Sequence, residues 1–181
     1  MIPAEARDGL ICYFEGYMIP LKDGTDRVRP YLCPAKVPTI GFGSTRYEDG
    51  RRVELFDPPI SRARAQTLVD WELERVCEPA IDRLITVRLH PLMRGAIASW
   101  TFNLGTGALQ TSTLRKVINA RRWDLVPSEM AKWRVANGQI LPGLVRRRAA
   151  EAQMFMRGVQ ALEGRAANDN APWAVTIQRA A

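Results

Sequence analysis

The sequence predicts an α+β fold that is predominantly helical, with a small N-terminal β region and a helical C-terminal lobe. Apolar residues recur at helical spacing over most of the chain after residue 60. Residues 17–50 are instead rich in glycine, proline and aspartate, with short β-favouring pieces such as residues 37–42 between the turns. With 181 residues, 46% hydrophobic and 25% charged, the chain can bury one core without disulfide bonds.

The first predicted helix spans residues 4–15, because Leu10, Ile11 and Phe14 share one helical face. Gly16 is expected to end it. Glu15 then lies in the last turn, where the negative end of the helix dipole offers a carboxylate no structural advantage. This placement favours a chemical role for Glu15 over the alternative, a surface acid at a helix end.

Five more helices are predicted after the β region. Residues 60–77 follow the N-cap Ser61, and Pro79 is expected to end or bend that helix. Residues 91–103 and 143–162 form the two longest of the others. Two short helices are expected between them, capped by Ser112 and Ser128, with a turn at Asn137 and Gly138 before the last helix. The apolar residues assigned to inner faces include Ala65, Leu68, Val69, Leu73, Val76, Leu92, Ala96, Ile97, Trp100, Leu144, Val145, Ala152 and Phe155.

The chain is expected to contain one domain, residues 1–163, and a flexible tail, residues 164–181. The tail is rich in alanine and ends the helical pattern. The alternative is a short docking strand, since Trp173, Val175 and Ile177 alternate along it. Trp71, Trp100 and Trp133 lie within apolar helical stripes and are expected in the core rather than as sugar platforms.

The net charge of +7 favours an anionic partner: a nucleic acid, a membrane surface or a cell-wall polymer. No helix-turn-helix, RNA-binding aromatic or zinc-finger pattern supports a nucleic acid. The chain has a single histidine, His90, which argues against a metal site with several His or Cys ligands and against a serine-histidine triad. Its three cysteines have no repeated spacing, which argues against a disulfide framework. The N-terminus lacks the features of a signal peptide, and no apolar run reaches membrane-spanning length.

The most informative residues are 14–16 (FEG) and 31–45 (YLCPAKVPTIGFGST). They resemble the helix end and the hairpin, Y-x-D/C-P-A-G-V-x-T-I-G-Y-G-H-T, of the family of T4-type lysozymes and lambdoid-phage endolysins, glycoside hydrolase family 24-like muramidases. Residues 100–109 (WTFNLGTGAL) and 143–151 (GLVRRRAAE) resemble two further blocks of that family. The similarity runs in order over roughly residues 9–155.

This resemblance implies a lysozyme-like fold that hydrolyses the β-1,4 bond between N-acetylmuramic acid and N-acetylglucosamine without a metal or cofactor. It assigns Glu15 as the acid and Cys33 and Thr39 as the residues that position water. A carboxylic acid can deliver a proton near neutral pH when burial raises its pKa. Thr39 could instead be a strand residue with no chemical role.

In this family a buried arginine of the closing helix pairs with the catalytic glutamate. The candidates here are Arg146, Arg147 and Arg148, of which Arg147 and Arg148 are favoured. Helical geometry places the three on different faces, so at least one is expected in solvent. Asn103 is expected to support the site or bind substrate, or else to satisfy buried backbone groups at its turn.

Three departures from the family pattern stand out. Cys33 replaces the usual aspartate, and a thiol, with a reference pKa near 8.5, is a poorer general base at neutral pH. A cysteine-bearing branch of the family is nevertheless regarded as active, and the alternative is that Cys33 is only a small buried residue. Glu15 and Cys33 are 18 residues apart, about twice the family norm, so Asp23 or Asp26 in the longer connection could replace the missing carboxylate. Ser44 replaces the usual histidine.

The sequence therefore predicts a muramidase, a phage or prophage endolysin, that acts as a monomer on bacterial peptidoglycan. It is expected to bind no nucleic acid, to insert stably in no membrane, and to stay in the cytoplasm until released to the periplasm and cell wall. A repurposed, weakly active or inactive muramidase domain that binds peptidoglycan or serves as a scaffold is the alternative.

Overall fold

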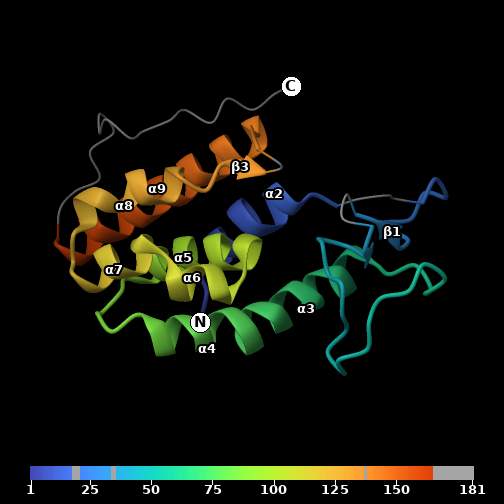
Figure 1. The fold of residues 1–181 in the computed structure, drawn as a ribbon. Helices are drawn as coiled ribbons and strands as arrows, with labels where there is room; N and C mark the ends of the chain where they lie inside the picture. The colour runs from blue at the N-terminus through green and yellow to red at the C-terminus, as the bar shows by residue number, and fades with distance from the viewer. Residues whose placement is uncertain (18–20, 34–35, 137, 165–181) are drawn as a thin grey trace.

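The computed structural model describes residues 1–17, 21–33, 36–136 and 138–164, and the fold is mostly helical, as predicted. Figure 1 shows a region of loops and short strands on one side, joined by the long helix α3 to a cluster of helices. The expected tail and its alternative as a docking strand fall on residues 165–181, outside the described part of the chain. Among the described residues, no helix has both the length and the apolar character needed to cross a bilayer.

The N-terminal helix is continuous and ends where the sequence predicts. It consists of α1 (Ala4–Ala6), the π-helical turn η1 (Arg7–Cys12) and α2 (Tyr13–Glu15). Leu10 and Ile11 are buried. Gly16 ends the helix with a φ of 71°, a conformation that glycine adopts at little cost.

The β region is small and irregular, as predicted. β1 (Tyr31–Leu32) pairs antiparallel with β2 (Pro38–Thr39), which sets Tyr31 opposite Thr39. A small core lies beneath these strands and the adjoining loops. Its buried members are Val28, Ile40, Tyr47, Val53 and Leu68, the last contributed by α3.

The helix after the β region runs further than the sequence predicts. It begins at α3 (Arg62–Glu72), passes through the π-helical turn η2 (Leu73–Cys77) and continues as α4 (Glu78–Leu84). Ser61 caps it as expected, because its side chain accepts a hydrogen bond from the backbone N–H of Arg64 at 3.2 Å.

The prediction that Pro79 ends or bends this helix is wrong about the end. Pro79 falls in the first turn of α4, directly after η2, where a missing N–H is tolerated because the i→i−4 pattern is already interrupted. The inner face also shifts. Val76 is 40% exposed and Cys77 is buried, since a π-helical turn inserts an extra residue.

The helical lobe is built around two long helices, α5 (Pro91–Leu104) and α9 (Pro142–Leu162), which pack along each other. Trp100 is fully buried on α5, and Trp133 packs against it edge-to-face, with ring centroids 5.1 Å apart. Both tryptophans therefore belong to the core or its margin, as predicted. Val145 on α9 is 40% exposed and lines a pocket between α8 and α9, so its assignment to a buried inner face is wrong.

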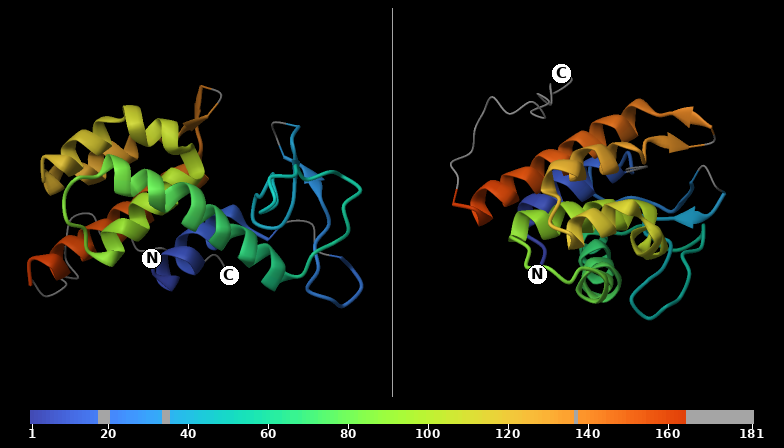
Figure 2. Two further views of the ribbon diagram at one scale, coloured as in Figure 1. Left: turned by 90° about the horizontal axis from the view of Figure 1, so that it is seen from below. Right: turned by 60° about the vertical axis from the view of Figure 1, so that its left-hand side comes forward.

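Short elements connect α5 to α9: α6 (Thr106–Thr111), α7 (Thr113–Asn119), η3 (Trp123–Leu125), α8 (Val126–Ala131) and the hairpin of β3 (Val135–Ala136) with β4 (Gln139–Ile140). Figure 2 shows this hairpin projecting beside the start of α9. Ser112 caps α7 by accepting from the N–H of Arg115 at 3.1 Å.

The predicted N-cap at Ser128 is wrong. The 3₁₀ turn η3 leads directly into α8, so Ser128 lies inside the helix, and its hydroxyl donates to the carbonyl of Leu125 at 2.8 Å. The turn predicted at residues 137–138 is described only at Gly138, whose φ is 76°; Asn137 lies outside the described residues.

Candidate active site

Glu15 lies where the N-terminal helix, the β region and the closing helix α9 meet. Its side chain is 21% exposed, and Oε1 accepts a hydrogen bond of 2.5 Å from Nη1 of Arg147, a residue that is 3% exposed. On the other side, Gly43 of the β region approaches the carboxylate: a Cβ on Gly43 would be 3.4 Å from Oε2. The acid is thus held by a buried cation and remains partly open to solvent.

The structure separates the three candidate arginines. Arg147 binds Glu15, whereas Arg148 is 1% exposed and donates from Nη2 to Oδ1 of Asn103 at 2.9 Å. Arg146 is exposed. Arg147 is therefore the partner of Glu15, and Arg148 holds the Asn103 side chain in place at the end of α5.

A fully buried carboxylate, Glu151, sits between these two arginines. Its Oε1 accepts from Nε of Arg147 at 3.2 Å, from Nη2 of Arg148 at 3.2 Å and from the hydroxyl of Ser99 at 2.7 Å. Nη2 of Arg147 also donates to the carbonyl of Ser99 at 3.2 Å. Burial raises the pKa of Glu151, and the two arginines oppose that effect.

Cys33 and Thr39 belong to the two arms of the β1–β2 hairpin: Cys33 follows β1, and Thr39 lies in β2. The N–H of Cys33 donates to the carbonyl of Val37 at 3.1 Å, and its side chain is partly exposed. Thr39 is 2% exposed, and its hydroxyl donates to the carbonyl of Val37 at 2.9 Å. The hairpin therefore holds the backbone of both residues within one short segment.

Tyr31 of this hairpin interacts electrostatically with Glu15, and the sequence reasoning did not select it. Burial raises the pKa of Tyr31, and the negative charges of Glu15 and Cys33 act in the same direction. Tyr31 of the hairpin therefore interacts electrostatically with both Glu15 and Cys33, which are 18 residues apart in the chain.

Asp23 and Asp26 are engaged elsewhere. Asp23 is on an exposed turn, where its carboxylate accepts from the N–H and hydroxyl of Thr25 and from Arg27. The carboxylate of Asp26 accepts from the backbone N–H of Arg62 at the start of α3, at 3.2 Å. These bonds argue against either aspartate as a replacement for the carboxylate missing at Cys33.

Glu72, at the end of α3, is a second carboxyl group that interacts electrostatically with Glu15, and the sequence reasoning missed it. Burial raises its pKa to about 7, and the charge of Glu15 adds to the effect. The signal was present in the sequence: Glu72 follows the buried Leu68 by four residues and Val69 by three, so it lies on the inner face of its helix. A carboxylate on an apolar face suggests a functional or strained site.

A pocket of about 600 Å³ opens beside Glu15, a size typical of small-molecule sites. Residues from three segments line it: Tyr13, Phe14 and Glu15 of the first helix, Asn103 of α5, and Leu141, Pro142, Gly143, Leu144, Arg146 and Arg147 at the start of α9. The wall combines the polar and charged side chains of Glu15, Asn103, Arg146 and Arg147 with apolar ones. Such a surface suits a sugar, which presents hydroxyl groups at its edges and C–H groups on its faces.

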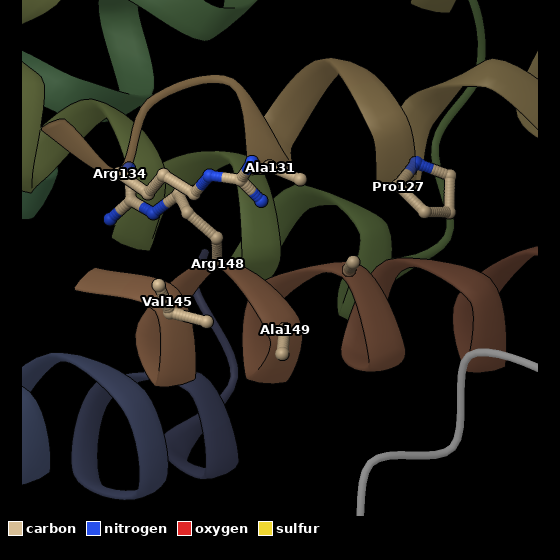
Figure 3. Close-up of a pocket in the computed structure, with 7 residues that line it drawn as sticks. Pro127, Ala131, Arg134, Val145, Arg148 and Ala149 are labelled. Atoms are coloured by element: carbon tan, nitrogen blue, oxygen red, sulfur yellow. The ribbon is translucent and has the colours of Figure 1, made fainter. Parts of the chain in front are cut away.

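A second pocket, between α8 and α9, has a different chemistry. Figure 3 shows Pro127 and Ala131 on α8 facing Val145 and Ala149 on α9, with the Arg134 side chain near one end. The residues that line it are apolar apart from Arg134 and Arg148, and they include no carboxyl group to serve as an acid. The chemistry is therefore expected at the pocket that contains Glu15.

Residues 22–151 match the family described as phage lysozyme, which is more than half of the chain. The chain belongs to the phage lysozyme family. The matched segment contains Cys33, Thr39, Asn103, Arg147 and Arg148, and it begins seven residues after Glu15.

Individual relatives agree with this assignment. The chain is 36% identical over 134 residues to the SAR-endolysin of Escherichia phage Mu, covering 74% of each protein. It is 31% identical over 99 residues to the endolysin of Bacillus phage B103, covering 55% of this chain but 37% of that protein. A solved endolysin from Escherichia coli O157:H7 phage FAHEc1 superposes with a TM-score of 0.73 and 27% identity, over 86% of this chain and 93% of the other. The lysozyme-like fold predicted from the sequence is confirmed.

Proposed function

We propose that this protein is a muramidase that cleaves the β-1,4 bond between N-acetylmuramic acid and N-acetylglucosamine in bacterial peptidoglycan, as a phage or prophage endolysin. The observation that carries the proposal is the Glu15 carboxyl, held by buried Arg147 in the wall of a polar and apolar pocket. Membership of the phage lysozyme family and the endolysin relatives support the same activity.

In this proposal Glu15 is the general acid. It gives its proton to the glycosidic oxygen as the bond from that oxygen to the anomeric carbon breaks. Water adds to the anomeric carbon and releases a proton, so that the cycle returns the proton that Glu15 donated. Arg147 orients the carboxyl, because its Nη1 holds Oε1, while Oε2 lies beside Gly43.

Cys33 and Thr39 are proposed to place the attacking water. The Thr39 hydroxyl donates its hydrogen bond to the carbonyl of Val37, so its oxygen can still accept a hydrogen bond from water. Attack from the face opposite the leaving group inverts the configuration and needs room for water, roughly 6.5–9.5 Å between the two groups. Asn103, fixed by Arg148, is proposed to contact the sugar from the pocket wall.

Peptidoglycan is the proposed partner, and the net charge of +7 suits anionic wall polymers. We propose that residues 1–163 act as one monomeric domain, that the protein accumulates in the cytoplasm and that it reaches the wall through a membrane lesion. Secretion of the intact chain without a lesion would contradict this route.

The test is release of soluble muropeptides from purified sacculi, followed by mass spectrometry. The wild type is expected to release products with reducing-end muramic acid, and Glu15→Gln is expected to release none. Glu5→Gln is the matched control, because Glu5 lies on the same helix but pairs with Arg157 on the surface. Sacculus binding without release by the wild type would instead support the scaffold alternative, which Cys33, Ser44 and the long connection motivate.

A further inference from the structure

Glu151 is a fully buried carboxyl group that the proposed mechanism does not use. Glu151 is 0% exposed and is the acceptor shared by Arg147, Arg148 and Ser99. Burying a carboxylate costs several kcal/mol unless it is paired and hydrogen-bonded. Hydrophobic residues of similar volume would often serve the fold as well. The arrangement therefore calls for an explanation other than stability.

The explanation lies in the geometry of Arg147. All three of its nitrogens are engaged: Nη1 by Glu15, Nε by Glu151 and Nη2 by the carbonyl of Ser99. Because the guanidinium group is planar, three acceptors at separate positions fix its orientation completely. Two of those acceptors belong to the core, and the third is the proposed acid.

We propose that Glu151 is a positioning residue for the acid: it fixes the Arg147 guanidinium and takes up part of its positive charge, so that Glu15 is held in place yet still able to carry the proton it donates. This inference rests on the proposed function and deepens it. Glu151 acts through Arg147 and does not touch the substrate.

The charge argument follows from the contacts. A cation at 2.5 Å favours the ionised form of a carboxyl group, which is the wrong form for a general acid. The Glu151 carboxylate, 3.2 Å from the same guanidinium, opposes that field, and the charges of Glu15, Arg147, Arg148 and Glu151 then sum to zero.

Among the described residues, Glu72 from α3 and Tyr31 from β1 also interact electrostatically with Glu15. Any negative charge on either favours the neutral form of Glu15, as Glu151 does. Arg148 contributes the opposite sign from α9. Removal of the negative charge of Glu151 should therefore change the pH range in which the enzyme works.

The experiment is the pH–rate profile of muropeptide release by Glu151→Gln, which keeps the shape of the side chain and removes its charge. We expect the alkaline limb to move to lower pH by about one unit, with kcat near neutral pH reduced about tenfold and KM little changed. Ser99→Ala is the control, since it removes a neutral hydrogen bond to the same oxygen and should leave the limb in place. An unmoved limb in folded Glu151→Gln would overturn the proposal.

Arg148→Gln tests the same balance with the opposite sign and remains informative if Glu151→Gln does not fold. It removes one positive charge, so the alkaline limb should move to higher pH; an unmoved limb or a downward shift would overturn the proposal. A carbon NMR titration of the Glu15 carboxyl in each variant gives a readout that needs no turnover. If the titration midpoint of Glu15 shifts in opposite directions in the two variants but the wild type is inactive, the positioning role of Glu151 stands and only the muramidase proposal is refuted.

Discussion

Arg147 on α9 donates a 2.5 Å hydrogen bond to Glu15 on α2, joining two residues 132 positions apart in the chain. The closing helix therefore completes the site that the first helix begins. Both helices also pack on α5, so the distance between the acid and its cation is set by the core of the helical lobe.

Arg147→Met is expected to reduce muropeptide release at least about 100-fold, because the acid loses the group that orients it. It should also destabilise the fold by about 3–5 kcal/mol, since Glu151 is left in the core with one partner fewer. Release is measured below the melting temperature of the variant. Arg157→Met is the control: this arginine of the same helix pairs with Glu5 on the surface, and a comparable loss there would contradict the assignment of Arg147.

Cys33→Asp is expected to raise kcat about tenfold, and Cys33→Ala to lower it. A carboxylate is a better general base than a neutral thiol and can also hold water. Turnover of purified sacculi by the two variants, with Cys33→Ser between them, grades the role of the residue. If all three variants match the wild type, Cys33 is a spectator.

Gly43→Ala is expected to lower both stability and activity. Gly43 has a φ of 99°, and a Cβ there would lie 3.4 Å from Oε2 of Glu15. Gly50→Ala is the matched control, because its φ is 86° and a Cβ would meet nothing within 4 Å. Both variants should lose about 1–2 kcal/mol from the backbone conformation, and only Gly43→Ala should also lose activity. Equal activities would contradict the close approach of Gly43 to the acid.

Glu72→Gln is expected to stabilise the protein above neutral pH. The pKa of Glu72 is about 7 in the folded state against an ordinary value of 4.5, so the folded protein binds the proton more tightly. Its contribution to stability is present in full below pH 4.5 and is lost as the pH rises to about 7. Glutamine removes that loss, worth about 1–3 kcal/mol.

The check is the difference in melting temperature between Glu72→Gln and the wild type at pH 4.5 and pH 8. The difference should grow with pH. Glu74→Gln, on the exposed side of the following turn, should show no such trend. A difference that is constant with pH would mean that Glu72 is not held in its neutral form by the fold.

Ser61→Ala is expected to cost about 0.5–2 kcal/mol in the free energy of unfolding, because Ser61 caps α3 through the N–H of Arg64. Ser128→Ala should cost less than about 0.5 kcal/mol, because Ser128 lies inside α8 and is exposed. Denaturant titrations of the two variants measure the contrast. Equal costs would argue for a cap at Ser128 after all.

Local patterns in the sequence were enough to predict most of the fold. Apolar spacing located the long helices. Ser61 marked the start of α3, Ser112 marked the start of the short helix α7, and Gly16 marked the end of the N-terminal helix. These features depend on residues within one or two turns of each other, so they can be read from the chain alone. The hairpin that carries Cys33 and Thr39 was predicted from the family resemblance of residues 31–45, whereas the local pattern indicated only an irregular β region.

Which residues of a helix face the core was harder to predict from the sequence. A π-helical turn at η2 moved burial from Val76 to Cys77, and nothing in the apolar pattern announces an extra residue in a turn. The start of α8 was misplaced because a 3₁₀ turn merges into it.

What the sequence by itself determined is the membership of the site at the level of segments: the end of the first helix, one hairpin and the closing helix. Only the tertiary structure decided that Arg147 rather than Arg148 binds Glu15, that Glu151 accepts from Arg147, and that Tyr31 and Glu72 interact electrostatically with Glu15. The physical reason is that a side chain's partner across 100 residues is chosen by how helices pack, and packing is a property of the whole core rather than of any local stretch.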